Sequence, residues 1–375
     1  MAESNIPNDP YQNIRPYHDR EVNLVLNKLI RNDEFISAIT RYQFPKLASW
    51  LGFLLKPAIR IFLAQKTDEV KSIADFQGLV AGYMEKMISR TTTRLSCSGF
   101  ENLDSDEAYL FISNHRDIAM DPAFVNWVLH QNNRNTVRIA IGDNLLRKPY
   151  VSDLMRLNKS FIVNRSAKGR EVLTALGQLS AYIDHSLVQD EHSVWIAQRE
   201  GRAKDGNDAT DPAILKMFYM SHRKERTFKE FLDRINIVPV SISYEYDPCD
   251  SAKANELSAK QQDGNYEKGQ YEDIESIVQG ITGNKGHVHV AFGNVIRGIE
   301  TPEELAAEID RQIIENYYLH PSNLIAAGED NAEASSQARN QFEERLQGLE
   351  PTAAEILRQM YANPVKNKHT LQEGV

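Results

Sequence analysis

The sequence predicts an α/β fold, with a central mixed, mostly parallel sheet flanked by helices and with helical extensions at both ends. Three observations lead to this prediction. Between about residues 96 and 298, short apolar runs alternate with helical patterns, which is typical of α/β domains. Residues 15–95 and the chain after Gly298 show helical spacing of apolar residues without such runs. The composition, 41% hydrophobic and 25% charged, is that of an ordinary globular protein.

The chain is predicted to have three regions. Residues 1–95 form an N-terminal helical region, in which Val22, Val25, Leu26 and Leu29 recur at helical spacing. Residues 96–298 form the α/β domain. Residues 299–375 form an acidic C-terminal helical region, with helical patterns at 302–318, 335–347 and 351–362. Within it, residues 300–350 hold 12 Asp or Glu against 3 Lys or Arg.

Apolar runs predict six strands, at 108–113, 137–142, 160–164, 193–197, 237–244 and 287–293. Helical patterns lie between them at 121–131, 168–186 and 211–233. Functional residues of such sheets tend to follow the carboxyl ends of strands. His115 follows the first run, Arg165 the third and residues 200–202 the fourth. The fifth run is interpreted as a buried strand, in which Pro239 is unusual because it has no N–H to donate; the alternative is an edge strand.

Charge and cysteine content exclude several classes of function. The net charge of −9 argues against a nucleic-acid partner, because phosphate backbones favour an excess of Lys and Arg. The two cysteines, Cys97 and Cys249, have no metal-ligand spacing and cannot form a disulfide framework, so we expect reduced thiols and no metal site. The polar, acidic start of the chain lacks the pattern of a signal peptide, and we expect a cytoplasmic protein.

The stretch 47–64 predicts an amphipathic helix rather than a membrane span, because Lys56, Pro57 and Arg60 interrupt its apolar character. A helical wheel places Ser49, Lys56 and Arg60 opposite an apolar face. That face comprises Leu47, Trp50, Leu51, Leu54, Ala58, Ile61 and Phe62. Such a helix either lies in a membrane interface or packs its apolar face on the core of the protein.

Basic residues are concentrated in residues 134–170, which carry nine Lys or Arg and only Asp143 and Asp153. This local excess in an acidic protein indicates either an anion site or a solvated basic face.

The motif FISNHRDIAMDPAF, residues 111–124, places a histidine after a strand and near two aspartates. A histidine acts as a general base when a carboxylate on its other ring nitrogen fixes the tautomer and stabilises the imidazolium. Asp117 and Asp121 are both candidates for this partner of His115. In the competing interpretation, Asp121 is the N-cap of a helix that begins at Pro122, and His115 is a turn residue.

Two further stretches carry candidate ligand-binding residues. Arg165 and Lys168 lie between a strand end and the start of a helix, which suits a phosphate. Glu200, Gly201 and Arg202 form a tight loop in which a glycine lets the backbone approach a ligand. The alternatives are a surface ion pair and a charged turn.

Four blocks in this order resemble the glycerol-phosphate acyltransferase superfamily, which includes lysophosphatidate and glycerol-3-phosphate acyltransferases. The matching residues are Asn114, His115 and Asp121; Phe161, Ile162 and Arg165; Glu200, Gly201 and Arg202; and Val238, Pro239 and Val240. The resemblance covers about residues 105–245, and the run at 287–296 looks like a late strand of the family. Five residues separate His115 from Asp121 where the family has four, which leaves Asp117 as an alternative partner.

The resemblance implies transfer of an acyl group from acyl-CoA or acyl-carrier protein to a glycerol-phosphate hydroxyl, with no metal or other cofactor. It implies that His115 is the general base and Asp121 its orienting carboxylate. Arg165, Lys168 and Arg202 would hold the acceptor phosphate, and Glu200 with Gly201 would shape the loop. A lipid product implies peripheral association with a membrane surface.

Alternatives remain open at this point. The acceptor is expected to be lysophosphatidate, with glycerol-3-phosphate or another lysolipid as alternatives. A hydrolase would use the same histidine on water. A non-catalytic lipid- or partner-binding protein would use its acidic C-terminal region as the working surface.

Overall fold

The computed structural model describes residues 9–44, 46–267, 269, 271–329 and 335–374, without the side chains of residues 48–50 and 263. The chain divides into two compact units. The first unit joins residues 1–84 to residues 138–175, and the second joins residues 85–137 to residues 176–375. The helices α4 (Ile73–Thr91) and α7 (Arg170–Asp184) contain points where the chain passes from one unit to the other.

The second unit is built on strands in the order β1-β7-β6-β2-β5. Their bounds are β1 Thr92–Ser98, β2 Tyr109–Ser113, β5 Val194–Ala197, β6 Asn236–Tyr244 and β7 Gly286–Phe292. The pairs β1–β7, β2–β6 and β2–β5 are parallel, whereas β6 and β7 are antiparallel. A mixed, mostly parallel sheet with flanking helices confirms the predicted fold class.

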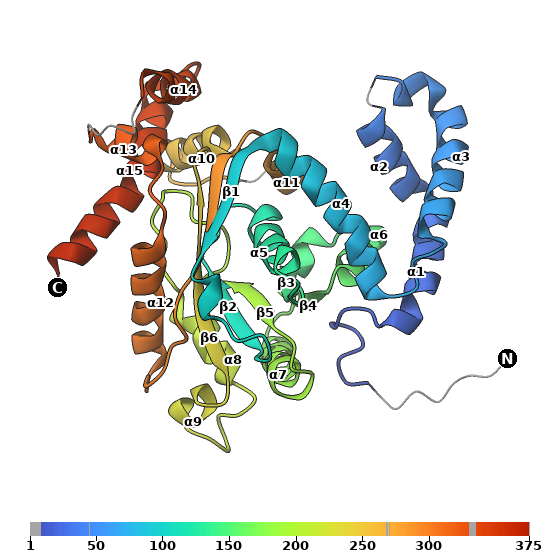
Figure 1. Ribbon diagram of the computed structural model, residues 1–375, viewed down its shortest axis with the longest axis horizontal. Helices are drawn as coiled ribbons and strands as arrows, with labels where there is room; N and C mark the ends of the chain where they lie inside the picture. Colours follow the sequence, from blue (N-terminus) through green and yellow to red (C-terminus); the bar gives the residue numbers. More distant parts are fainter. Residues whose placement is uncertain (1–8, 45, 268, 270, 330–334, 375) are drawn as a thin grey trace. The chain divides into compact units, whose positions relative to one another are not determined.

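Helices cover both faces of this sheet, as Figure 1 shows for α5 and α12. Neighbouring residues of β6 point to these opposite faces: the Tyr244 ring contacts Phe124 of α5, whereas the Ser243 hydroxyl contacts His320. The helices lying wholly in the second unit are α5 Met120–Gln131, α8 Pro212–Tyr219, α9 Phe228–Leu232, α10 Asp250–Asp263, α11 Glu272–Thr282, α12 Pro302–Asn316, α13 Pro321–Ala327, α14 Ser336–Leu346 and α15 Pro351–Glu373.

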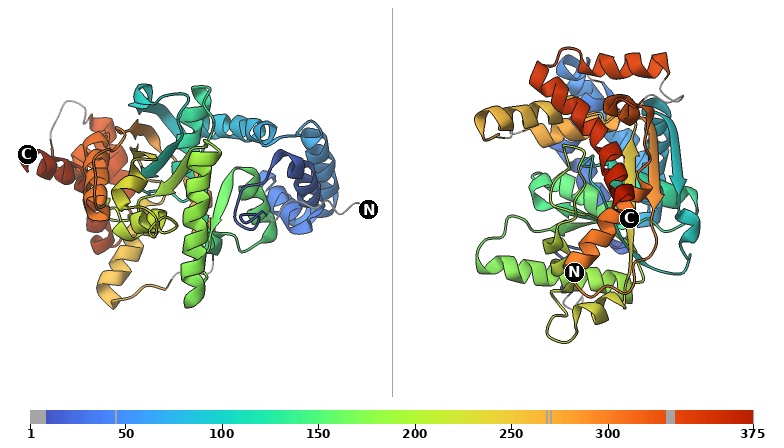
Figure 2. Two further views of the ribbon diagram at one scale, coloured as in Figure 1. Left: turned by 90° about the horizontal axis from the view of Figure 1, so that it is seen from below. Right: turned by 90° about the vertical axis from the view of Figure 1, so that its left-hand side faces the viewer.

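The C-terminal helices α13, α14 and α15 gather with α10 around a core of their own (Figure 2). Its fully buried members include Ala254 of α10, Phe342 of α14 and Leu357 of α15. This burial of apolar side chains explains why the region folds despite its acidic composition.

The first unit contains α1 (Asp19–Arg31), α2 (Asp33–Gln43), α3 (Ala48–Thr67), α6 (Pro149–Leu157) and the parallel strands β3 (Arg138–Gly142) and β4 (Ser160–Val163). The spaced apolar residues of α1, including Val22 and Leu29, pack in one cluster with Leu157 of α6. This cluster confirms the helical pattern that the sequence predicts for α1.

The helix α3 exposes apolar side chains that an ordinary amphipathic helix would bury against the protein. Leu54, Ile61 and Phe62 of the predicted apolar face are 58%, 61% and 51% exposed. Arg60, on the polar face, forms an ion pair with Asp33 of α2 and donates to the carbonyl of Ile30. The alternative in which the apolar face packs on the core is therefore wrong for these residues, whereas Arg60 of the opposite face contacts α1 and α2. The side chains of Ser49 and Trp50 lie outside those described.

All six predicted strands are present within two residues of their expected bounds, and β1 is an additional one. The interpretation of residues 237–244 as an edge strand is wrong, since β6 lies between β7 and β2. The Pro239 carbonyl accepts from Gly293 N at 2.8 Å, so the missing N–H of Pro239 falls on the β7 side, beyond the last paired residue Phe292. The predicted helix at 211–233 is interrupted, forming α8 and α9. None of the helices among the described residues combines the length and the apolar character needed to cross a bilayer.

Candidate active site

The centre of the candidate site is a histidine paired with a buried carboxylate. His115, directly after β2, lies with its Nδ1 2.8 Å from Oδ2 of Asp121, which is fully buried. A carboxylate can only accept, so the proton of the neutral imidazole resides on Nδ1 and the lone pair on Nε2. The side chain of His115 keeps 14% of its surface exposed, so the ring is not sealed in the core. This is the geometry of a general base with an orienting carboxylate.

Asp121 is held by donors from three directions. Its Oδ2 also accepts from the backbone N–H groups of Arg116 at 2.6 Å and Asp117 at 2.9 Å. Its Oδ1 accepts from the hydroxyl of Tyr244 on β6 at 2.7 Å. Burial, and then the charge of Asp121, raises the pKa of Tyr244 well above its usual value, so this hydroxyl stays protonated and donates. Asp121 lies in the first turn of α5, where the helix dipole favours a negative charge.

The alternative roles of the two aspartates are resolved by their contacts. The Oδ1 of Asp117 accepts from Ala119 N at 2.9 Å and Met120 N at 2.8 Å, so Asp117 binds the start of α5. The interpretation of Asp121 as the helix N-cap is therefore wrong, because α5 already begins at Met120. Asp117 is the less suitable partner for His115, since its other oxygen faces Gly280 of α11.

Asp117 occupies a buried and confined position. A methyl group on Gly280 would lie 2.0 Å from Asp117 Oδ2, so only a glycine lets α11 approach this carboxyl. That oxygen has no hydrogen-bond partner among the described residues. Burial, and then the charge of Asp121, raises the pKa of Asp117 to about 6.

The imidazole is oriented by packing as well as by Asp121. The Trp195 ring of β5 meets the His115 ring edge-to-face, with 5.9 Å between their centroids. Asn114, the residue before His115, is fixed by β6: its side chain accepts from Ile242 N at 2.8 Å and donates to Ile242 O at 3.0 Å. Asn114 of the matched motif is therefore structural here, joining the end of β2 to β6.

Arg202 lies in the loop after β5, which reaches the histidine through its backbone. Ala203 N donates to the carbonyl of His115 at 2.9 Å. Gly201 has φ +77°, and Glu200 and Gly201 are exposed. The Arg202 guanidinium is partly buried and approaches Ser276 Oγ of α11 at 3.5 Å. The structure thus places Arg202 in a loop anchored to His115, and Glu200 in the same loop is exposed.

A buried charge network that the motifs do not indicate supports this centre. Arg116 donates to Asp208 at 2.6 Å, and its guanidinium lies over the Tyr317 ring at 5.7 Å. Lys253 of α10, 2% exposed, donates to the Arg116 carbonyl at 2.7 Å and pairs with Asp247. These groups fix the side chain and the carbonyl of Arg116, and its backbone N–H binds Asp121. In the sequence, this network is indicated only by the charged residues next to His115, Arg116 and Asp117.

Arg165 and Lys168 belong to the first unit, so their proposed meeting with His115 stays a prediction. Both side chains are exposed. The Asp143 carboxylate shapes their loop, accepting from Arg165 N at 3.1 Å and Ser166 N at 3.2 Å. Despite partial burial, these bonds hold the pKa of Asp143 below its usual value.

Part of the basic run has structural roles within the first unit. Arg156 donates to the carbonyls of Arg15 at 2.8 Å and Gln12 at 2.6 Å and stacks on Tyr17. Lys148 pairs with Glu34 at 3.0 Å. The excess of positive charge is therefore only partly available for an anion.

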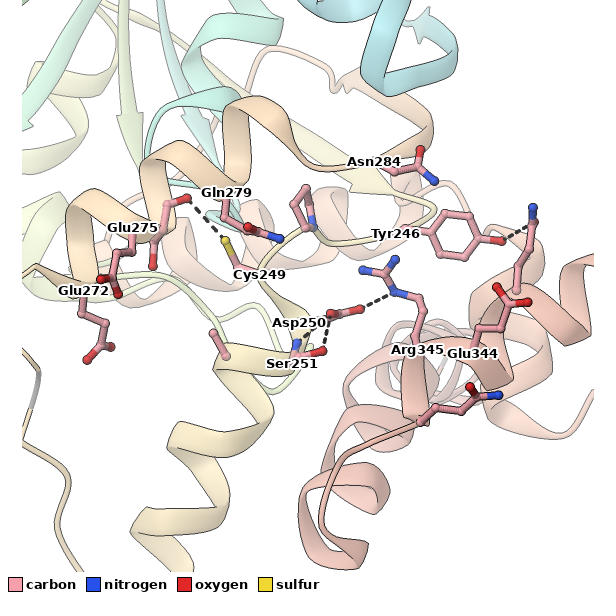
Figure 3. A pocket seen from close by; sticks show the side chains of 15 residues that line it. Tyr246, Cys249, Asp250, Ser251, Glu272, Glu275, Gln279, Asn284, Glu344 and Arg345 are labelled. Carbon is pink, nitrogen blue, oxygen red and sulfur yellow. Dashed lines mark hydrogen bonds and ion pairs between the residues drawn. The ribbon is translucent and has the colours of Figure 1, made fainter. Parts of the chain in front are cut away.

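A cavity of about 710 Å³ lies beside α11 in the second unit (Figure 3). Four carboxylates and one guanidinium line it, from Asp250, Glu272, Glu275, Glu344 and Arg345. Arg345 is occupied by Asp250 at 2.6 Å, as the dashed line in Figure 3 marks. This acidic lining is unfavourable for a phosphate or for CoA. Both cysteines are free thiols, Cys249 on the cavity wall and Cys97 exposed. No group of three potential metal ligands occurs among the described residues.

Comparisons with known proteins add an independent result. The sequence matches the Acyltransferase family over residues 94–243, which include β2, His115, Asp121 and the Arg202 loop. A comparison with curated proteins finds no match. Among solved structures, the 1-acyl-sn-glycerophosphate (LPA) acyltransferase PlsC from Thermotoga maritima is similar over 88% of this chain and 99% of that chain, at 14% identity and a TM-score of 0.41. Residues 94–243 of this chain are thus similar to the Acyltransferase family.

Proposed function

We propose that this protein is an O-acyltransferase that moves a fatty acyl group from an acyl thioester to a hydroxyl of 1-acyl-glycerol-3-phosphate. The observation that carries this proposal is the His115–Asp121 pair at 2.8 Å, directly after β2 of an acyltransferase domain. The donor is acyl-CoA or acyl-carrier protein, used as a co-substrate without any further cofactor.

The proposed reaction begins when Nε2 of His115 removes the proton of the acceptor hydroxyl. The oxygen attacks the thioester carbonyl and forms a tetrahedral intermediate. The C–S bond then breaks, and the departing sulfur takes the proton from the imidazolium. Asp121 stabilises the imidazolium while it exists, because it is a full negative charge in direct contact with Nδ1.

The acceptor phosphate is proposed to bind Arg202, and the contribution of Arg165 and Lys168 stays a prediction from the sequence. Arg202 is favoured because its loop is hydrogen-bonded to the His115 peptide, so a phosphate held there would share a rigid frame with the base. A guanidinium suits this role because it can donate two parallel hydrogen bonds to phosphate oxygens. Gly201 leaves the loop backbone open to the ligand.

The central test replaces His115 with alanine. Purified protein is incubated with labelled acyl-CoA and a panel of phosphorylated acceptors, and the products are identified by mass. We expect His115→Ala to abolish acylation while the thermal melt is retained. His130→Ala, at an exposed position in the last turn of α5, is the matched control and should keep full activity. Acylation that survives in His115→Ala would contradict the mechanism, and free fatty acid without acylated acceptor would indicate a hydrolase.

We further propose that the protein associates peripherally with a membrane through α3. The apolar side chains of α3 are exposed, whereas its arginine is turned to α2, which is the arrangement that inserts into a lipid interface. Flotation with phosphatidylglycerol–phosphatidylcholine vesicles tests this proposal. We expect Ile61→Glu to lose binding and Leu24→Glu, at a 75% exposed leucine of α1, to retain it. Wild-type protein that does not float with the vesicles would contradict it.

A further inference from the structure

The loop that carries Arg202 is tied to the histidine at its beginning. Gln198 N donates to Ser113 O at 2.8 Å, and Ala203 N donates to His115 O at 2.9 Å. Arg202 lies between these two bonds. The conformation of the loop therefore determines where the guanidinium sits relative to the imidazole.

The other side of this loop rests on the C-terminal helix α15. Asn363 Nδ2 donates to the carbonyl of Asp205 at 2.7 Å. Gly206 is buried with φ +82°, and a methyl group there would lie 2.2 Å from the carbonyl oxygen of Met360. A side chain at residue 206 is thus disfavoured twice, by the left-handed backbone and by the helix backbone against it.

A proline explains why the Met360 carbonyl is available to the loop. In an α-helix this carbonyl would accept from the N–H of the residue four positions later. That residue is Pro364, which lies inside α15 and has no N–H. The Met360 oxygen is left without its usual helix bond at the point where the Cα of Gly206 approaches, which suits a Cα–H···O contact.

The part of α15 that meets the loop is itself firmly held. The Tyr361 hydroxyl donates to Asp250 at 2.8 Å and accepts from Asp247 N at 2.8 Å. The Tyr361 carbonyl accepts from Asn323 Nδ2 at 2.9 Å. The loop therefore packs on a fixed surface, and a shift of α15 would move the loop with it.

We propose that Gly206, Asn363 and Pro364 are positioning residues, which hold the Arg202 loop against His115 through helix α15. This inference rests on the proposed function, because it assigns Arg202 to the acceptor. It gives the C-terminal helix a role in substrate binding, although α15 lies outside the matched acyltransferase domain.

The decisive variant is Pro364→Ala. It restores the N–H that binds the Met360 carbonyl within the helix, so α15 should become more stable while the loop loses its contact. We expect an unchanged or higher Tm together with a KM for the acceptor that rises about tenfold or more, and an unchanged KM for the thioester. Pro351→Ala is the matched control, because Pro351 lies in the first turn of α15, where its missing N–H has no helix partner. It should leave both KM values unchanged.

A second variant probes the same contact from the loop. Gly206→Ala should raise the acceptor KM, whereas Gly298→Ala, at φ +76° with open space around it, reports the cost of left-handed strain alone. Amide hydrogen exchange at Ala203 is measured in all variants, and we expect faster exchange in Pro364→Ala and Gly206→Ala.

Unchanged Ala203 exchange in both variants would overturn the proposal, and so would an unchanged acceptor KM in an active enzyme. A wild-type protein that acylates no acceptor would refute the proposed function instead. The exchange comparison would then still decide whether α15 holds the loop.

Discussion

Replacing Asp121 with asparagine removes the charge behind His115 with little change of shape. Three of the four hydrogen bonds of Asp121 end on Oδ2 and come from His115, Arg116 and Asp117. The asparagine oxygen can occupy that position, and its NH₂ group then faces the Tyr244 hydroxyl, which can accept instead of donate. We therefore expect Asp121→Asn to fold and to keep the imidazole tautomer.

The expected loss is electrostatic. Unit charges about 4 Å apart attract by about 4 kcal/mol at an effective dielectric constant of about 20. This attraction stabilises the imidazolium that forms during the reaction but not the neutral imidazole of the resting state. Its loss predicts a decrease of kcat of about 10³-fold, since about 1.4 kcal/mol corresponds to a factor of ten.

The assay follows thiol release from acyl-CoA at saturating acceptor, with the product confirmed by mass and folding checked by a thermal melt. Tyr244→Phe is the matched comparison, because it removes one hydrogen bond to Asp121 but leaves the charge, and it should cost less than about tenfold. A folded Asp121→Asn enzyme that retains more than a tenth of the wild-type kcat would refute the role assigned to this carboxylate.

Three further predictions concern stability. Gly280→Ala should lower the free energy of unfolding by about 1–3 kcal/mol, because the methyl group would overlap the confined Asp117 carboxyl; urea unfolding measures it. Burial, and then repulsion from His287, lowers the pKa of His289 to about 4 and of His320 to about 3. Their contribution to the free energy of unfolding is fully present above pH about 6.5, where the unfolded chain also has neutral imidazoles. As the pH drops towards 4, the free energy of unfolding should fall by about 1.4 kcal/mol per pH unit for each histidine, measured by urea titrations at several pH values. A flat profile would contradict it. A chain ending at Gly348 should show no cooperative melt, because it lacks four large buried side chains of α15, each contributing about 1.5–3 kcal/mol.

The sheet was predictable because its central strands are buried on both faces and read as continuous apolar runs. The strand β1 was not, because it lies at an end of the strand order and its sequence TTRLSCS needs no apolar run. The helix α10 was also missed. Its inner face includes Lys253 and Glu256, which are 2% and 4% exposed and which any sequence pattern assigns to the surface.

The candidate site, too, was only partly predictable from the sequence. His115 and Asp121 were predictable because they lie six positions apart and belong to one motif. The network behind them is formed by residues that are far apart in the chain, such as Arg116 and Asp208, 92 positions apart, and Lys253, 137 positions from Arg116. Charged residues of this kind look solvated in a sequence. Only the fold reveals that they neutralise one another around the Arg116 peptide, whose N–H binds the catalytic carboxylate candidate.

The contacts of the acidic C-terminal region bear on the non-catalytic alternative, in which its carboxylates would face a partner. Several of them are instead used within the chain. Arg311 pairs with Glu308 at 2.8 Å and Glu315 at 2.6 Å, and Asp310 accepts from Thr210 in the segment that follows the Arg202 loop. Tyr317, directly after α12, also packs on Arg116, the residue next to His115. The region therefore supports the backbone around His115. These contacts favour a structural role of the region within the chain over a role as a separate docking surface.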